Sequence, residues 1–145
     1  MASSFTLYPS ARKYCHDGTI DFDTATIKLM LVTSSYTPST THTIKADITN
    51  EVASGDGYTT GGTALVNPAV TYTQSPSAGK FDADDHVIAA LTKVFRYGIL
   101  YVEGTVNGIV NPLIGYILYD TTPADITVSG LSWTTQWASA GIITF

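Results

Sequence analysis

The chain has 145 residues, of which 44% are apolar and only 13% are charged, and its formal net charge is −5. Its seven basic residues are scattered, which argues against nucleic-acid binding, because neutralising phosphates requires clustered Lys and Arg. No apolar run reaches the about 18 residues of a membrane span, and the N-terminus lacks the pattern of a secretory signal. We therefore expect one soluble domain over residues 1–145, made in a cytoplasm and contacting neither nucleic acid nor membrane.

Uncharged residues supply most of the polarity, with 23 Thr and 12 Ser in the chain. Threonine is favoured in pleated sheets, so the composition indicates a β protein. A surface with few charges also resembles the core of a protein–protein interface more than a surface that meets bulk water. The single cysteine, Cys15, cannot form an intrachain disulfide.

The first part of the chain predicts one helix and one strand. Residues 9–14, which begin with Pro9, suit one or two helical turns that Asp17 and Gly18 would close. Residues 27–33 alternate between a fully apolar face and a mixed face that includes Lys28, which is typical of a half-buried strand.

Turn-forming residues dominate positions 34–63. A loop of this length is uncommon inside a domain and is usually functional or disordered. We expect short strands or a helical turn around residues 44–52. Tyr36 and Tyr58 are aromatic anchors that would pack the loop against another surface.

The second half of the chain predicts a series of short strands. Residues 93–103 and 113–119 are apolar on both faces, and Asn107-Gly108 between them is a strong hairpin signal. Such strands lie in the middle of a sandwich or bury one face in another subunit. The remaining expected strands are 64–66, 69–73, 80–83, 126–131 and 141–145.

Together these patterns predict an all-β fold: a single-domain antiparallel β-sandwich or barrel of about seven to nine short strands. Long Ser/Thr/Gly-rich loops and one short N-terminal helix complete the prediction. Leu29 and Ile99 are expected in its core.

No local motif indicates catalysis, and we predict no enzyme, no catalytic residue and no cofactor. His16, His42 and His86 are far apart in the sequence, and Cys15 lies outside any nucleophile signature. A hydrolase would need one of these histidines beside a carboxylate or a nucleophile.

Three acidic residues in four positions, Asp82, Asp84 and Asp85, form the sharpest charge cluster. Calcium binds clustered carboxylates, so these three are the candidates for a metal site. The spacing of an EF-hand is absent, and a solvated turn is the commoner structure for such a cluster. We therefore predict no metal site, with calcium at this turn as the alternative.

Trp133 and Trp137 lie four residues apart in a Ser/Thr-rich segment. Exposed aromatic rings can stack sugars, which would make the chain a carbohydrate-binding adhesion module. Burial in a core or an interface is the commoner fate of large aromatic side chains.

Several segments resemble the small head-decoration, or capsid cement, proteins of tailed bacteriophages. They are residues 6–43, NEVASGDGYTTGGTAL (50–65), FDADD (81–85), FRYGILY (95–101), PLIGYILYD (112–120) and GIITF (141–145). The resemblance implies a structural virion protein, made in a host bacterium, that binds the capsid exterior and bridges subunits of the major capsid protein. It also implies a homo-oligomer, with a trimer favoured. A tail, neck or baseplate component is the alternative.

Contact with the capsid or between subunits is expected from the loop over residues 34–62, since long polar loops on rigid sheets commonly carry binding. The candidate contact residues are Tyr36, Thr37, Pro38, Tyr58, Thr59 and Thr60.

Overall fold

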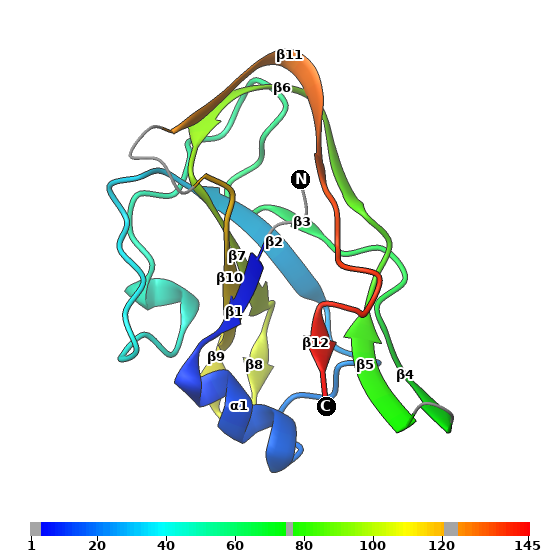
Figure 1. Ribbon diagram of the computed structural model, residues 1–145. Coiled ribbons are helices and arrows are strands. Elements are labelled where there is room, and N and C mark those ends of the chain that lie inside the picture. The colour runs from blue at the N-terminus through cyan, green and yellow to red at the C-terminus, as the bar shows by residue number, and fades with distance from the viewer. Residues whose placement is uncertain (1–3, 75–76, 121–124) are drawn as a thin grey trace.

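The computed structural model describes residues 4–74, 77–120 and 125–145 (Figure 1). In these residues every strand pairing is antiparallel. The predicted all-β, sandwich-like fold is confirmed. The expected seven to nine strands are too few, because the described residues form twelve, several only two residues long.

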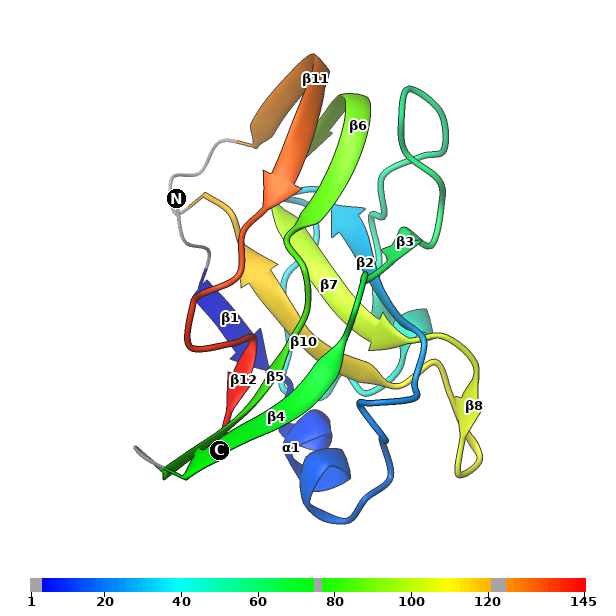
Figure 2. The ribbon, with the colours of Figure 1, turned by 90° about the vertical axis from the view of Figure 1, so that its right-hand side faces the viewer.

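The largest sheet has five strands, and their order in space differs from their order in the chain (Figure 2). Alternating apolar side chains favour strands because β-branched and aromatic residues pack well on a pleated surface. From edge to edge the strands are β1 (Ser4–Leu7), β10 (Leu113–Leu118), β7 (Tyr97–Val102), β2 (Ile27–Val32) and β3 (Thr63–Ala64).

A second layer of strands covers one face of this sheet. A bent two-stranded ribbon arches over it and continues into a three-stranded sheet, whose outer hairpin projects from the body (Figure 1). The ribbon is β6 (His86–Phe95) with β11 (Ile126–Thr135), and the small sheet is β12 (Ile143–Thr144), β5 (Ser77–Asp82) and β4 (Ala69–Gln74).

The single strand expected at residues 93–103 is wrong, because the segment contains the end of β6 and all of β7. The chain crosses from the ribbon to the five-stranded sheet at Arg96, whose backbone N–H donates to the carbonyl of Val32 at 2.8 Å. Apolar residues run through the crossing because both strands are buried, so periodicity alone gives no sign of the break.

The core has two parts, one on each face of the five-stranded sheet. Leu29 and Leu100 belong to the part beneath the ribbon, whereas Met30, Val32 and Ile99 belong to the part on the opposite face. Burial of Leu29 and Ile99 is confirmed. The expectation that β2 is half-buried is wrong, because residues 33–49 fold back over its second face, where Met30 and Val32 are also buried.

Three smaller elements complete the fold. The expected N-terminal helix is α1 (Pro9–His16), and the expected turn near residue 45 is a 3-10 helix, η1 (Lys45–Asp47). Asn107 and Gly108, at φ 47° and 80°, form the tight turn between β8 (Thr105–Val106) and β9 (Ile109–Val110). None of the described helices is long and apolar enough to cross a membrane.

Candidate binding surfaces

A cluster of tyrosines fixes the first half of the long loop on the sheet. Tyr36 reaches inward from the loop, and its hydroxyl oxygen lies 2.6 Å from that of Tyr8 and 2.8 Å from Nδ1 of His42. The rings of Tyr97 and Tyr116 pack around this pair. Burial raises the pKa of Tyr8 and of Tyr36, so both hydroxyls keep their protons at neutral pH.

The second half of the loop is held by Tyr58, which is 4% exposed. Its hydroxyl donates to a carboxylate oxygen of Glu51 at 2.8 Å and accepts from the backbone N–H of Leu31 at 3.1 Å. The backbone N–H of Gly61 donates to the same carboxylate oxygen. The Tyr58 side chain thus satisfies the backbone N–H of Leu31 on β2. Burial also raises the pKa of the Tyr58 hydroxyl.

Two glycines of this segment are required by close packing. A Cβ at Gly62 would lie 1.8 Å from the carbonyl oxygen of Leu29, and the backbone there has φ +72°. A Cβ at Gly57 would lie 2.6 Å from the carbonyl oxygen of Ala90 on β6 of the ribbon. The glycine-rich sequence at residues 55–62 therefore lets this segment approach the backbones of β2 and β6 closely.

The six candidate contact residues divide into buried and exposed groups. Tyr36 and Tyr58 point into the protein and are not available at the surface of this chain. Thr37, Thr59 and Thr60 are exposed, and Pro38 is half-buried. The structure therefore leaves the threonines and the proline as the candidates for contact, while the tyrosines act as anchors.

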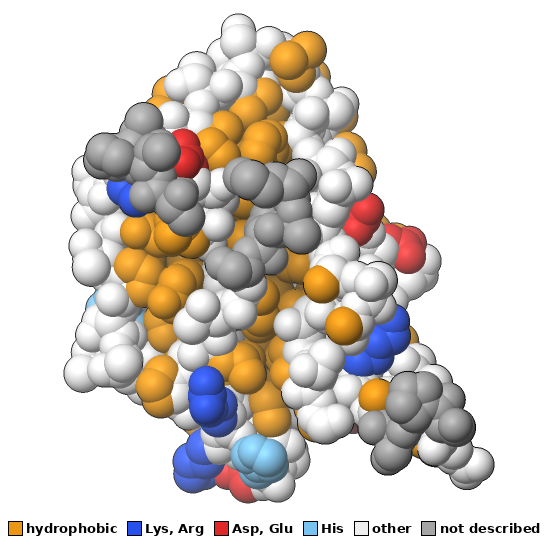
Figure 3. Space-filling view, in the orientation of Figure 1, with side chains coloured by type: hydrophobic (Ala, Val, Ile, Leu, Met, Phe, Trp, Pro, Cys, Tyr) orange, Lys and Arg blue, Asp and Glu red, His pale blue; other side chains and the backbone are white. Residues whose placement is uncertain are grey.

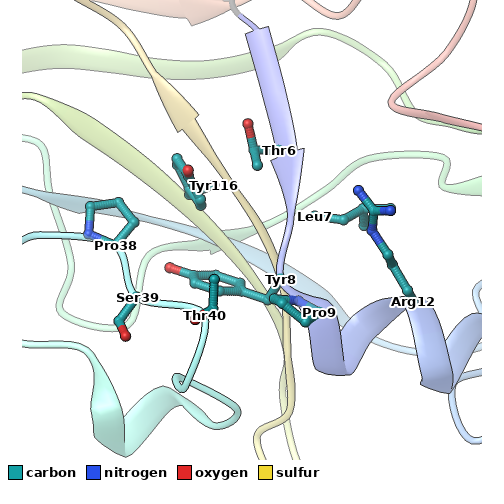
Figure 4. Close-up of a pocket in the computed structure, with 9 residues that line it drawn as sticks. All are labelled: Thr6, Leu7, Tyr8, Pro9, Arg12, Pro38, Ser39, Thr40 and Tyr116. Atoms are coloured by element: carbon teal, nitrogen blue, oxygen red, sulfur yellow. The ribbon is translucent and has the colours of Figure 1, made fainter.

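Pro38 lines a surface groove of about 350 Å³ between the loop and the N-terminal segment (Figure 4). Tyr8 and Tyr116 contribute aromatic surface to it, and Ser39 contributes a hydroxyl group. Arg12 of α1 also lines this groove, and Figure 4 shows its side chain beside β1. The groove offers an aromatic surface with polar rims.

The carboxylates of Asp82, Asp84 and Asp85 bind separate protein partners. Asp82 pairs with the Lys80 ammonium at 2.8 Å. Asp84 accepts from the side-chain amide of Asn67 at 2.8 Å, and Asp85 accepts from the backbone N–H of Trp137 at 3.0 Å. No group of three or more metal-ligating side chains occurs within residues 4–74, 77–120 and 125–145. The turn joins neighbouring segments of the second layer.

The histidines occupy three separate environments. His16 is exposed, His42 belongs to the tyrosine cluster, and His86 is buried with Nε2 at 3.0 Å from the Thr63 hydroxyl. Burial lowers the pKa of His86, and no described hydrogen bond joins it to a carboxylate. Burial raises the pKa of the Cys15 thiol, which disfavours the reactive thiolate.

The two tryptophans pack against protein. The ring of Trp133 meets Phe95 and Tyr119 edge-on at centroid distances of 5.1 and 5.3 Å. The indole N–H of Trp137 donates to the carbonyl of Asp84 at 3.0 Å. Both are partly buried against the first core, which favours packing over a sugar-stacking platform.

Sequence reasoning missed the apolar side chains that the second layer exposes. Tyr72 on β4 is 76% exposed, and Leu131 on β11 is 66% exposed. Alternation predicts strands at these positions but cannot show that a hairpin projects from the body or that a ribbon arches. The exposed large apolar residues described are Val66, Val70, Tyr72, Val87, Val94, Val110, Leu131 and Phe145.

No protein-family model matches the chain, and neither a curated protein nor a solved structure matches it significantly. The resemblance to head-decoration proteins therefore stays a prediction from the sequence. The features that bear on function are the surfaces described above: the exposed residues of the long loop, the groove between that loop and the N-terminal segment, and the exposed apolar side chains of the second layer.

Proposed function

We propose that the chain is a structural virion protein that binds the outer surface of a tailed-phage capsid and bridges major capsid subunits. The observation that carries the proposal is the exposure of large apolar side chains on two separate projections. Val70 and Tyr72 lie on the projecting β4–β5 hairpin, whereas Val87, Val94 and Leu131 lie on the arched β6–β11 ribbon. Exposed apolar side chains on projecting elements are available for contact with another protein, and burying them there would remove apolar surface from water.

Bridging requires two contact surfaces on a body that does not deform between them. The ribbon and the hairpin lie at different ends of the molecule (Figure 1). The five-stranded sheet is packed on both faces, and buried residues of the ribbon and of the small sheet belong to the same part of its core. A shell under internal pressure would pull on the two contacts in different directions, and a packed core transmits such a load.

The low charge of the chain suits this role. Interface cores are depleted in charged residues and enriched in aromatic ones, and the exposed faces of β4 and β11 are made mainly of Thr, Ser, Val, Leu and Tyr. In the proposed particle the protein is a homo-oligomer, with a trimer favoured, because a symmetric shell offers cyclic positions to its ligands.

The test is cryo-electron microscopy of particles made with the gene intact and with the gene deleted. The proposal predicts density at regular positions on the outer shell of intact particles, bridging neighbouring subunits, and its loss on deletion. Deleted particles should also release DNA at a lower temperature. Density on the tail, neck or baseplate would replace the proposal with that location, and absence from all particles would overturn both.

A paired variant tests the contact surfaces. Tyr72→Ser and Leu131→Ser each remove an exposed apolar side chain and should reduce binding to gene-deleted particles without changing the thermal unfolding of the free protein. Thr127→Ser, at another exposed position on β11, is the control and should bind as the unchanged protein does. Equal binding by all three would show that neither projection contacts the shell.

A further inference from the structure

An open slot runs between the edge strands β1 and β12. Two adjoining grooves of about 380 and 360 Å³ form it, and they share Phe5, Ile142 and Thr144 in their walls. Among the described residues, β1 pairs only with β10 and β12 pairs only with β5, so each of these strands presents one edge without a described strand neighbour. Figure 3 shows apolar side chains along the gap and cationic side chains at its lower end, near α1.

The backbone of β1 directs unpaired groups into this slot. The N–H of Tyr8 donates to the carbonyl of Ile114, which continues the register of β1 with β10. Because backbone groups alternate in direction along an antiparallel strand, those of Phe5 and Leu7 point away from β10. No hydrogen bond to these outward groups is found among the described residues. A free edge of this kind is a template for another strand.

The opposite wall of the slot, β12, also directs backbone groups into it. Phe145 and Gly79 exchange both backbone hydrogen bonds, at 3.0 and 3.2 Å. By the same alternation, the N–H and C=O of Thr144 point away from β5 and toward the slot. Ile142 is buried beside them and gives the slot an apolar floor.

Arg12 gives the slot its charge. Among the described residues that line the two grooves, none is acidic and Arg12 is the only cation. Four of the other basic side chains form ion pairs with acids, and Lys45 and Arg96 lie over tyrosine rings. Within residues 4–74, 77–120 and 125–145, Arg12 is the cation without such a partner.

We infer that this slot binds an extended, acidic segment of a partner polypeptide, which adds a strand to the open edge of β1 and places a carboxylate on Arg12. Main-chain hydrogen bonds supply the affinity, and alternate side chains of the bound segment pack against the apolar floor of the slot. The inference deepens the proposed function and rests on it for the identity of the partner, a capsid subunit.

The test uses synthetic peptides and the free protein, so its outcome is separate from that of the particle experiment. The probe is a capped hexapeptide of alternating Thr and Val with Asp at each end, and a second peptide carries Lys at each end. Binding is followed by backbone amide NMR and hydrogen exchange. We expect the Asp peptide to bind about tenfold more tightly than the Lys peptide, and to shift and protect the amides of Phe5, Leu7 and Thr144.

Arg12→Glu should invert the preference between the two peptides. Lys13→Glu makes the same charge change at the next position of α1, outside the slot, and should keep the preference of the unchanged protein. Thermal unfolding of both variants controls for folding. The inference is overturned if neither peptide binds at about 10 mM, if the shifted amides lie elsewhere, or if the two variants behave alike. Protection of Phe5 and Leu7 that rises with protein concentration alone would assign the slot to a second copy instead.

Discussion

The two faces of the five-stranded sheet are buried by different means. Strands cover one face, and their backbone groups are satisfied by the ladders of the ribbon and the small sheet. An irregular loop covers the other face, so side chains must satisfy the backbone in place of a ladder. Asp47 accepts from the backbone N–H of Thr43 and Ile44, at 2.8 and 3.1 Å, and Ser34 donates from its backbone to Asp125 at 2.9 Å. A loop can therefore replace a sheet as a cover, provided that particular polar residues occupy particular positions.

The largest expected effect falls where the loop meets β2. Gly62→Ala should destabilise the protein by about 4 kcal/mol or more, since the new Cβ would overlap the Leu29 carbonyl oxygen. Gly18→Ala is the matched control, because Gly18 has the same φ of +72° with no atom within 4 Å of the added Cβ. Gly18→Ala should lower the free energy of unfolding by only about 1–2 kcal/mol, which is the cost of placing a side chain on a left-handed backbone. Urea unfolding measures both, and similar losses would show that the close approach is unimportant.

Core truncations compare the two covers directly. Leu29→Ala lies under the ribbon and Ile99→Ala under the loop, and each should destabilise by about 2–5 kcal/mol. We expect the smaller loss at Ile99, because an irregular cover can move into the cavity more easily than a paired ribbon. Equilibrium urea unfolding ranks the two. A larger loss at Ile99 would mean that the loop is the more rigid cover.

Removal of single hydroxyls should show how much the long loop depends on side-chain hydrogen bonds to the backbone. Tyr58→Phe leaves the backbone N–H of Leu31 without a partner and removes one of the two donors to the Glu51 carboxylate oxygen, so we expect the free energy of unfolding to fall by about 1–3 kcal/mol. Tyr119→Phe, in the same part of the core, removes one hydrogen bond to the hydroxyl of Thr135 on β11 at 2.7 Å, and a loss of about 1 kcal/mol is expected. Equal losses from thermal unfolding would show that the loop does not depend on side-chain bonds to the backbone.

The smallest effect is a dependence on pH. Burial lowers the pKa of His86, so below about pH 6.5 the unfolded chain takes up a proton that the folded protein does not. Stability should fall as the pH drops from about 7 to about 5.5, by at most ~1.4 kcal/mol per pH unit. Above pH 7 the histidine is neutral in both states and has no effect. His86→Gln should flatten this part of the profile, which urea unfolding at a series of pH values would measure.

The elements with one strong local pattern were predictable. Residues 27–33 and 113–119 match β2 and β10 to within one residue, and the helix begins at Pro9 as the sequence indicates. Apolar alternation and a first-turn proline are local properties, and they need no knowledge of the partner element.

Features that depend on distant partners were not predictable. β1 gave no clear signal, because its four residues form a strand only beside β10. The inward direction of Tyr36 and Tyr58 follows from hydroxyl partners up to 28 residues away in the sequence. The slot between β1 and β12 has no local pattern at all, since two strands from opposite ends of the chain form its walls.

The pairing of β1 with β10 also has a consequence for synthesis. Ser4 pairs with Leu118, and Ile27 pairs with Val102, so the central sheet joins the earliest residues to late ones. A ribosome must release the chain as far as Leu118 before this sheet can close, and such non-local pairing folds slowly. Until then the apolar β2 segment is exposed to other nascent chains, which favours aggregation. Production at high level should therefore be limited by events after translation, and slower translation should bring little improvement in yield.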